Sequence, residues 1–190
     1  MNEICFVTGN KNKLREVQSL LSNYKIVSLD DLHFSEDIAE TENTIQGNAE
    51  LKAKFINNRF NIDCFSDDTG LFIDSLDGLP GVKSARYAGD NCSSDENIDL
   101  VLKNLKNISN RNASFRTVIC LIKNNKTYLF EGVVNGKITE ERVGHDGFGY
   151  DPIFIPQGYD KTFSELTINE KNAISHRGIA INKLVNFLNG

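Results

Sequence analysis

Short apolar runs that end in polar turns alternate with amphipathic segments, and this order restricts the fold class. Residues 4–7 predict a buried strand and residues 8–10 a polar turn. A helix is predicted to follow, with Leu14, Val17 and Leu21 on one apolar stripe. Residues 24–29 then predict a second strand and residues 44–60 a second helix. We therefore expect a mixed α/β fold, in which helices cover a sheet.

The middle of the chain has the pattern of a sheet interrupted by one helix. Residues 64–66 predict a brief strand that Asp67 and Asp68 interrupt, and extended character resumes at residues 71–73. Ser93 and Glu96 form the pattern of a capping box, which predicts the start of a third helix.

The second half of the chain has the pattern of an antiparallel meander. Residues 113–123 and 127–134 flank Asn124-Asn125 and predict a hairpin, with a third strand at residues 137–142. Apolar residues at helical spacing between 181 and 188 predict a final helix.

Composition limits the partners and the compartment. The 190 residues suit one domain and show no repeat or linker, so we expect a single domain over residues 1–190. The chain has 21 basic and 26 acidic residues, which gives a formal net charge of −5. A protein with this charge has no overall positive field to attract a nucleic-acid polymer. No apolar run is long enough for a membrane span, and the four cysteines lack metal or CxxC spacing. We expect a cytoplasmic protein with buried free thiols.

The first strand-to-helix turn is a candidate phosphate-binding loop. A helix start offers unpaired backbone N–H groups and a positive dipole end, and two lysines add charge. The loop lacks the glycines and the Ser or Thr of a Walker A motif, and an ordinary turn with solvated lysines is equally compatible. Its residues are Thr8, Gly9, Asn10, Lys11, Asn12 and Lys13.

Two consecutive carboxylates follow an apolar run at Asp67 and Asp68. Burying them without a cation is costly, and a hard divalent metal such as Mg²⁺ removes that cost. Glu40 can add another carboxylate, although an isolated Asp-Asp-Thr-Gly is also typical of a turn or cap. Lys52 lies on the apolar stripe of its predicted helix, so it must either extend outward to solvent or meet an anion.

Two further segments have polar and aromatic residues suited to a base pocket. Phe148, Gly149, Tyr150 and Asp151 combine two rings with a carboxylate on a glycine-rich backbone, which can stack a base and bond its edge. The alternative is a loop that its aromatic residues hold in place. A second polar run begins the last helix, where solvated helix surface is the ordinary interpretation; it contains His176 and Arg177, with Lys171 shortly before.

Taken together, these segments resemble one family, the inosine/xanthosine triphosphate pyrophosphatases, also called non-canonical purine nucleotide pyrophosphatases. Six motifs occur in the family's order and approximate spacing over nearly the whole chain. They are TGNKNK, ET followed by NAELKA, SDDTGL, GLPGVKSARYAG, GFGYDPIF and EKNAISHRG.

The resemblance implies an elongated mixed sheet flanked by helices, two lobes with an active-site cleft between them, and a homodimer. It implies Mg²⁺ on Glu40 and Asp68, with Asp68 as proton acceptor and Asp67 in support. It also implies that residues 8–13 and Lys52 hold the triphosphate and that Thr69 contacts the substrate. The implied surroundings of the purine and its phosphates are Phe148, Gly149, Tyr150, Asp151, Lys171, His176 and Arg177.

The chain departs from the family pattern near the predicted metal site. Glu42 stands where many members have Gly, Ile45 replaces a usual Phe, and Gly47 enters the helix. Thr69 replaces the more usual bacterial Ser, and both residues supply one hydroxyl. No catalytic group of the family pattern is missing.

The implied reaction cleaves a deaminated purine triphosphate, such as ITP, dITP or XTP, to the monophosphate and pyrophosphate. Attack of water at the α-phosphorus fits a site with Mg²⁺, cations and a carboxylate base. A pyrimidine-preferring pyrophosphatase of the Maf type is an alternative, against which the Ser-His-Arg segment argues. A nucleotide sensor without chemistry is another, against which the clustered acids argue.

Overall fold

The structure, a computed structural model, describes residues 2–21 and 23–190. These residues form two compact units. Unit 1 comprises the residues up to Asp68 together with Thr117–Gly132 and Arg177–Gly190. Unit 2 comprises Thr69–Arg116 and Val133–His176. Three long strands contribute residues to both units.

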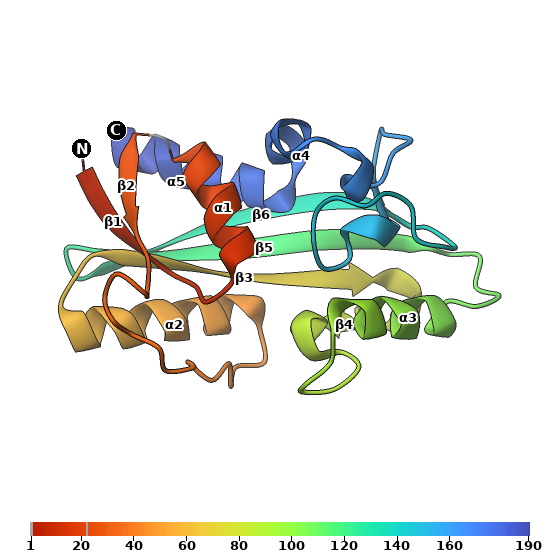
Figure 1. The fold of residues 1–190 in the computed structure, drawn as a ribbon, viewed down its shortest axis with the longest axis horizontal. Helices are drawn as coiled ribbons and strands as arrows, with labels where there is room; N and C mark the ends of the chain where they lie inside the picture. Colours follow the sequence, from red (N-terminus) through yellow and green to blue (C-terminus); the bar gives the residue numbers. More distant parts are fainter. Residues whose placement is uncertain (1, 22) are drawn as a thin grey trace. The chain divides into compact units, whose positions relative to one another are not determined.

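The described residues form a mixed sheet of seven strands in the order β2-β1-β3-β5-β6-β7, with β4 paired to β3 (Figure 1). Strand β1 pairs in parallel with β2 and β3, whereas the β3–β4 and β6–β7 pairs are antiparallel. The strands are β1 (Asn2–Val7), β2 (Tyr24–Val27), β3 (Cys64–Ile73), β4 (Pro80–Gly81), β5 (Asn112–Lys123), β6 (Lys126–Ile138) and β7 (Phe154–Pro156).

Five α-helices flank this sheet in the described part of the chain, which confirms the expected mixed α/β class. None of them, within residues 2–21 and 23–190, has the length and apolar character needed to cross a membrane. The helices are α1 (Lys11–Leu20), α2 (Ile45–Phe60), α3 (Ser94–Asn104), α4 (Ile168–Ile174) and α5 (His176–Asn189).

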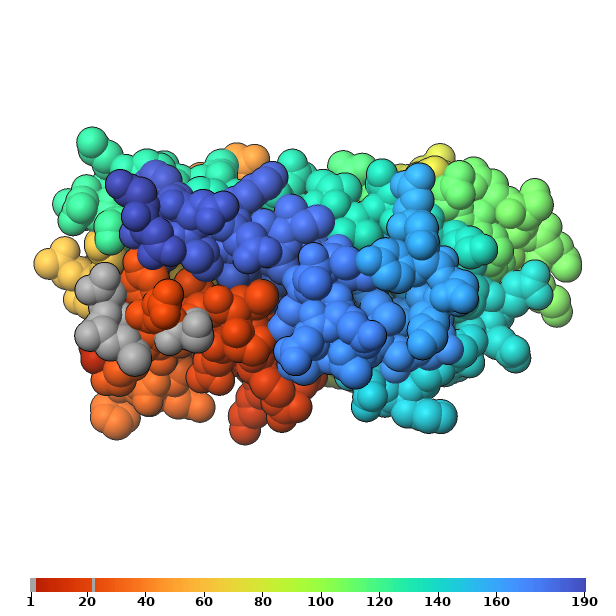
Figure 2. All heavy atoms as spheres, turned by 90° about the horizontal axis from the view of Figure 1, so that it is seen from above, coloured from red at the N-terminus to blue at the C-terminus, as the bar shows by residue number. Residues whose placement is uncertain are grey.

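In unit 1 the helices cover both faces of the strands. Phe6 and Phe65 stack at 4.6 Å and pack with apolar residues of α1 and α5, which lie on one side. Helix α2 lies on the other side, where Ser66 Oγ donates to the carbonyl of Ala49 (Figure 1). Figure 2 shows the last helix, in dark blue, beside the N-terminal residues in red and orange. Each strand therefore presents alternate side chains to different helices.

Unit 2 has its own core, built around aromatic residues. The ring of Phe115 lies 4.7 Å from Phe154, and Phe163 packs beside both. Apolar residues of α3 and the last residues of β3 complete the cluster. Helix α3 begins with the predicted capping box, in which Ser93 and Glu96 exchange hydrogen bonds.

The predicted hairpin is confirmed, since Asn124 and Asn125 join β5 to β6 and both have positive φ angles. The predicted third strand at residues 137–142 is wrong. Strand β6 runs on to Ile138, and its next partner is β7, with Lys137 opposite Ile155. Helix α4 was not predicted, because its seven residues carry no long apolar stripe.

The prediction that the two aspartates interrupt a strand is also wrong. Strand β3 runs without a break from Cys64 to Ile73 and includes both carboxylates. Gly70 permits this, since a Cβ atom there would lie 2.6 Å from the Gly81 carbonyl oxygen of the paired strand β4. The strand continues because the charges of Asp67 and Asp68 find partners on the adjacent helices.

Candidate active site

Asp67 and Asp68 lie at consecutive positions of β3, and their side chains therefore point to opposite faces of the strand. Both are buried, with 2% and 6% of their surface exposed. Asp67 meets α1 and α5, whereas Asp68 meets α2. The same strand thus supplies two carboxylates to two separate networks within unit 1.

The Asp67 network consists of alternating charges. Lys13 Nζ lies 3.0 Å from Asp67 Oδ1, and Arg177 Nε lies 3.1 Å from Asp67 Oδ2. The Arg177 guanidinium also donates to Glu16 at 2.5 Å. Two cations and two carboxylates are therefore balanced, as buried ions require.

Charge balance sets the protonation state of Asp67. Burial on its own would raise its pKa, but Lys13 and Arg177 outweigh burial and hold the pKa of Asp67 well below its usual range. Burial lowers the pKa of Lys13 in spite of the adjacent Asp67 carboxylate. Asp67 is therefore an ionised anchor for two cations and is poorly suited to accept a proton.

The Asp68 network is less fully compensated. Asn48 Nδ2 donates to Asp68 Oδ2 at 3.3 Å, and Lys52 Nζ lies 3.7 Å from Asp68 Oδ1. Lys52 also lies 2.6 Å from Glu40 Oε1 and donates to the Asp67 carbonyl at 2.8 Å. The lysine on the apolar stripe of α2 thus meets anions, one of the two outcomes expected for it.

The pKa of Asp68 shifts in the opposite direction to that of Asp67. Burial raises the pKa of Asp68 above its ordinary value, and the nearby Glu40 carboxylate adds to this effect, while Lys52 opposes both. Burial would lower the pKa of Lys52, but the carboxylates of Asp68 and Glu40 hold it above the usual value. A carboxylate with a raised pKa has the character of a general base.

Two departures from the family pattern are linked by packing. A Cβ atom on Gly47 would lie 2.8 Å from Cβ of Glu42, so the larger residue at position 42 needs glycine at position 47. The backbone N–H of Glu42 donates to Asn48 Oδ1 at 3.0 Å. The segment before α2 is therefore connected through Asn48 to Asp68.

The candidate phosphate loop connects β1 to α1. Asn10 caps the helix, and its side chain accepts hydrogen bonds from the N–H groups of Asn12 and Lys13. The Thr8 hydroxyl accepts from the N–H of Asn10. Gly9, Asn10, Lys11 and Asn12 are exposed, whereas the Lys13 side chain turns inward to Asp67. A phosphate at this loop would meet an exposed backbone beside the partly buried ammonium group of Lys13.

The donors for a metal are carboxylate oxygens. Within residues 2–21 and 23–190, no group of three or more His, Cys, Asp or Glu side chains is arranged to hold a metal ion. Glu40 and Asp68 nevertheless approach one position, because both lie close to Lys52 Nζ. Mg²⁺ commonly takes one or two protein carboxylates and completes its shell with water and phosphate oxygens, so this donor pair fits it.

The purine-segment residues of unit 2 form a third cluster. Lys171 Nζ lies 2.7 Å from Asp151 Oδ2 with both side chains buried, and the Phe148 N–H donates to the same oxygen at 2.8 Å. The ammonium of Lys171 lies 4.7 Å from the centre of the Phe148 ring. Gly147 is required here, since a Cβ atom would lie 2.3 Å from Asp151 Oδ2.

Of the other predicted residues of unit 2, Tyr150 and His176 are buried, whereas Thr69 and Gly149 are partly buried. The Tyr150 hydroxyl donates to the Ser84 carbonyl, and burial raises its pKa. His176 stacks on Phe115 with ring centres 4.6 Å apart. Thr69 is half-buried on β3, and Gly149 has a positive φ of 60°. Of the two rings in the predicted base pocket, Phe148 is partly buried beside Lys171, whereas Tyr150 is buried and bonded to Ser84.

Two residues with roles in these networks were not predicted. Glu16 is 5% exposed and Asn48 is fully buried. Asn48 lies within the NAELKA motif, and a polar residue among the apolar positions of α2 is a signal for it. Glu16 carries no comparable signal, because its partner Arg177 lies 161 residues away.

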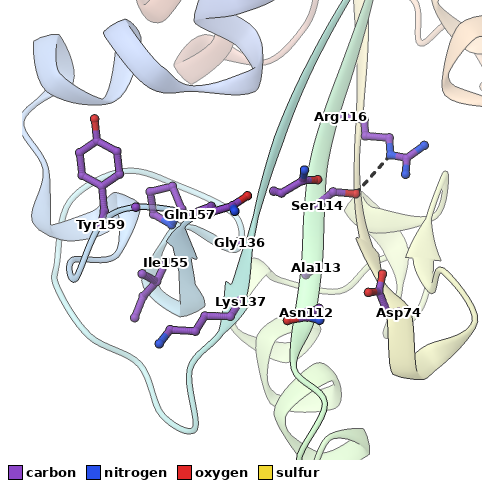
Figure 3. A pocket seen from close by; sticks show the side chains of 13 residues that line it. Asp74, Asn112, Ala113, Ser114, Arg116, Gly136, Lys137, Ile155, Gln157 and Tyr159 are labelled. Atoms are coloured by element: carbon purple, nitrogen blue, oxygen red, sulfur yellow. Dashed lines mark hydrogen bonds between the residues drawn. The ribbon is translucent and has the colours of Figure 1, made fainter.

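A cavity of about 610 Å³ lies in unit 2, apart from all the predicted site residues (Figure 3). Its lining includes Arg116, whose Nε donates to Ser114 Oγ at 3.2 Å and whose guanidinium lies over the Phe72 ring. Lys137 and Asp74 add opposite charges to the wall. This mixed lining does not define a ligand.

The fold defines a mixed α/β protein, and its unit 1 contains buried carboxylates of β3 paired with lysines of α1 and α2. The sequence profile of the Ham1 family matches residues 4–187. The chain therefore belongs to the Ham1 family.

Relatives and solved structures agree with this assignment. A protein of Flavobacterium psychrophilum named dITP/XTP pyrophosphatase is 50% identical over 186 residues, covering 97% of this chain and 98% of that protein. One of the same name from Porphyromonas gingivalis is 46% identical, covering 99% and 98%. The Staphylococcus aureus Ham1 protein structure has a TM-score of 0.90 at 38% identity, covering 100% and 99% of the two chains. The resemblance noted in the sequence is confirmed.

Proposed function

We propose that this chain hydrolyses non-canonical purine nucleoside triphosphates, ITP, dITP and XTP, to the monophosphate and pyrophosphate. Family membership and the names of its relatives support the reaction. The observation that carries the proposal is the buried Asp68, whose pKa is raised and which lies between Asn48 and Lys52. Removal of deaminated purines from the nucleotide pool is the expected biological role.

Asp68 is proposed as the base. It orients a water molecule and takes its proton while the water oxygen bonds to the α-phosphorus and the bond to the bridging oxygen breaks. Pyrophosphate leaves with the electron pair of that bond. Lys13 and Lys52 offset the charge of the leaving group, and Asp67 holds Lys13 in position.

Glu40 and Asp68 are proposed to hold Mg²⁺. Bound there, the metal would offset negative charge on the phosphate oxygens and so favour departure of pyrophosphate. The support is the pair of hard oxygen donors that approach Lys52 Nζ at 2.6 Å and 3.7 Å. Pyrophosphate release measured with and without Mg²⁺ tests this assignment and separates an enzyme from a sensor.

The other predicted contacts belong to the proposal. Residues 8–13 would hold the triphosphate, and Thr69 would contact the substrate. The buried Lys171–Asp151 pair beside Phe148 supports a rigid wall for the base. The proposed purine-side residues are Phe148, Gly149, Tyr150, Asp151, Lys171, His176 and Arg177. The homodimer and the cytoplasmic location are also part of the proposal.

A hydrolysis panel tests the function. We expect kcat/KM for ITP and XTP to exceed that for ATP by at least about tenfold, since adenine presents a donor where the 6-keto purines present an acceptor. Pyrophosphate should be the first product. Comparable values for ITP and ATP, or orthophosphate as the first product, would contradict the proposal. Light scattering at several protein concentrations tests the homodimer.

A further inference from the structure

Lys52 occupies an unusual position for a phosphate-binding lysine. Its Nζ lies 2.6 Å from Glu40 Oε1 and 3.7 Å from Asp68 Oδ1, and it donates to the Asp67 carbonyl at 2.8 Å. The Lys52 side chain is 12% exposed, Glu40 23% and Asp68 8%. One ammonium group therefore contacts both carboxylates proposed as metal ligands.

The backbone of α2 keeps Lys52 in this place. Ser66 Oγ donates to the carbonyl of Ala49, and Cys64 Sγ lies 3.3 Å from the carbonyl of Ala53. These contacts hold α2 against β3 on both sides of position 52. The helix therefore fixes the position of the Lys52 backbone. The ammonium group can leave the two carboxylates only by rotation about the side-chain torsions.

We propose that Lys52 is a built-in counter-ion of the metal site, which holds Glu40 and Asp68 together in the free protein and competes with the divalent metal for them. The proposal rests on the proposed Mg²⁺ assignment. Two carboxylates near one position repel each other unless a cation lies close to both. Because a lysine and a metal ion near the same oxygens also repel each other, metal binding must displace or weaken the Lys52 contacts.

Lys13, on α1, provides a matched control, because it pairs with a carboxylate of the same strand β3. It is also a lysine, 14% exposed, and it pairs with Asp67 at 3.0 Å. Lys13 pairs with Asp67, which is not a proposed metal ligand. Lys52 instead contacts Glu40 and Asp68, the two proposed ligands. Removal of Lys13 therefore deletes the same charge from unit 1 without removing the cation that joins the two proposed ligands.

The test measures Mn²⁺ binding to the free protein, without nucleotide, by electron paramagnetic resonance and calorimetry. We expect Lys52→Met to lower the Kd for Mn²⁺ by at least about tenfold, and Lys13→Met to change it by less than about threefold. Chelator should also lower the Tm of Lys52→Met more than that of wild type, since the two carboxylates then lack their cation.

Lys52→Gln gives a second reading if Lys52→Met does not fold in chelator, because the amide retains a donor without the charge. Unchanged or weaker Mn²⁺ binding in the folded Lys52 variants overturns the proposal. Equal tightening in Lys13→Met also overturns it, since the effect would then be one of net charge. If Asp68→Asn binds Mn²⁺ like wild type, the metal assignment itself fails, and that failure is visible separately.

Discussion

Asp67 and Asp68 are chemically identical neighbours on one strand, yet their surroundings differ in charge. Asp67 lies between the cations of Lys13 and Arg177, and its pKa is lowered. Asp68 lies beside a neutral Asn48 and shares Lys52 with Glu40, and its pKa is raised. The difference shows that the protonation of a buried acid is decided by the helix it faces.

The two sides of β3 differ in the charges that they place around their aspartate. The Asp67 side of β3 joins α1 to α5 through a buried ion network, as the packing of buried charges demands. The Asp68 side has fewer charge partners among its contacts, which suits a group that takes up a proton or binds a metal. Substitutions on the Asp67 side should therefore lower the free energy of unfolding. Substitutions on the Asp68 side should instead lower kcat.

The largest expected effect is on the Asp67 side. Arg177→Ala removes the guanidinium shared by Asp67 and Glu16, and we expect it to lower the free energy of unfolding by about 3–5 kcal/mol. Urea denaturation followed by circular dichroism measures this loss.

Arg59→Ala is the control for Arg177→Ala. Arg59 pairs with Glu36 at 2.8 Å, but both side chains are about half exposed, at 47% and 58%. Its removal should lower the unfolding free energy by less than about 1 kcal/mol. If the two variants have the same free energy of unfolding, the buried Arg177 network stabilises the protein no more than an exposed ion pair does. The proposed structural role of the Asp67 side would then be wrong.

A second prediction concerns the Asp68 side. Asp68→Asn should lower kcat by at least about 10²-fold, because it removes the base and weakens metal binding together. Its Tm should stay near that of wild type, whereas Asp67→Asn should melt clearly earlier. Steady-state kinetics measure kcat and thermal melts measure Tm for both variants. A kcat near that of wild type in folded Asp68→Asn would exclude this residue as the base.

Asn48 offers a smaller and more selective perturbation. Asn48→Ala removes the hydrogen bond to Asp68, and we expect kcat to fall by about tenfold with a smaller change in KM. Asn57→Ala is a control on the same helix, since Asn57 bonds the Ile62 carbonyl and does not contact Asp68. A KM effect without a kcat effect in Asn48→Ala would argue that Asn48 does not position the base.

The smallest predicted effect is on pH dependence, measured in chelator. The pKa of Asp67 is lowered, so its contribution to stability is present above the unfolded value of 3.8 and is lost as pH falls below it. The pKa of Asp68 is raised, so its contribution to stability is present below the unfolded value of 3.8. That contribution is lost as pH rises from 3.8 through the folded pKa.

Urea titrations of wild type, Asp67→Asn and Asp68→Asn across this range test the signs. Asp67→Asn should reduce the loss of stability on acidification below pH 3.8, and Asp68→Asn should remove the decline that occurs on raising the pH above it. Equal slopes for the two variants would mean that both aspartates titrate alike.

Local features were predictable from the sequence where neighbouring residues determine them. The Ser93–Glu96 capping box and the Asn124–Asn125 turn are satisfied within a few residues, and both occur as predicted. The strands and helices of the first 60 residues follow their apolar periodicity for the same reason. The family was also predictable, because the six motifs occur in its order along the chain.

Partners far apart in the sequence decided the rest. Strand β3 continues through Asp67 and Asp68 because α1, α2 and α5 bring opposite charges, and no local pattern contains that information. Glu16 is buried only because Arg177 reaches it, and β6 pairs with β7 rather than with residues 139–142. The sequence by itself determined which elements form and which side chains carry charge; tertiary packing decided which charges meet, because the energy of a buried ion depends on what lies within a few ångströms of it.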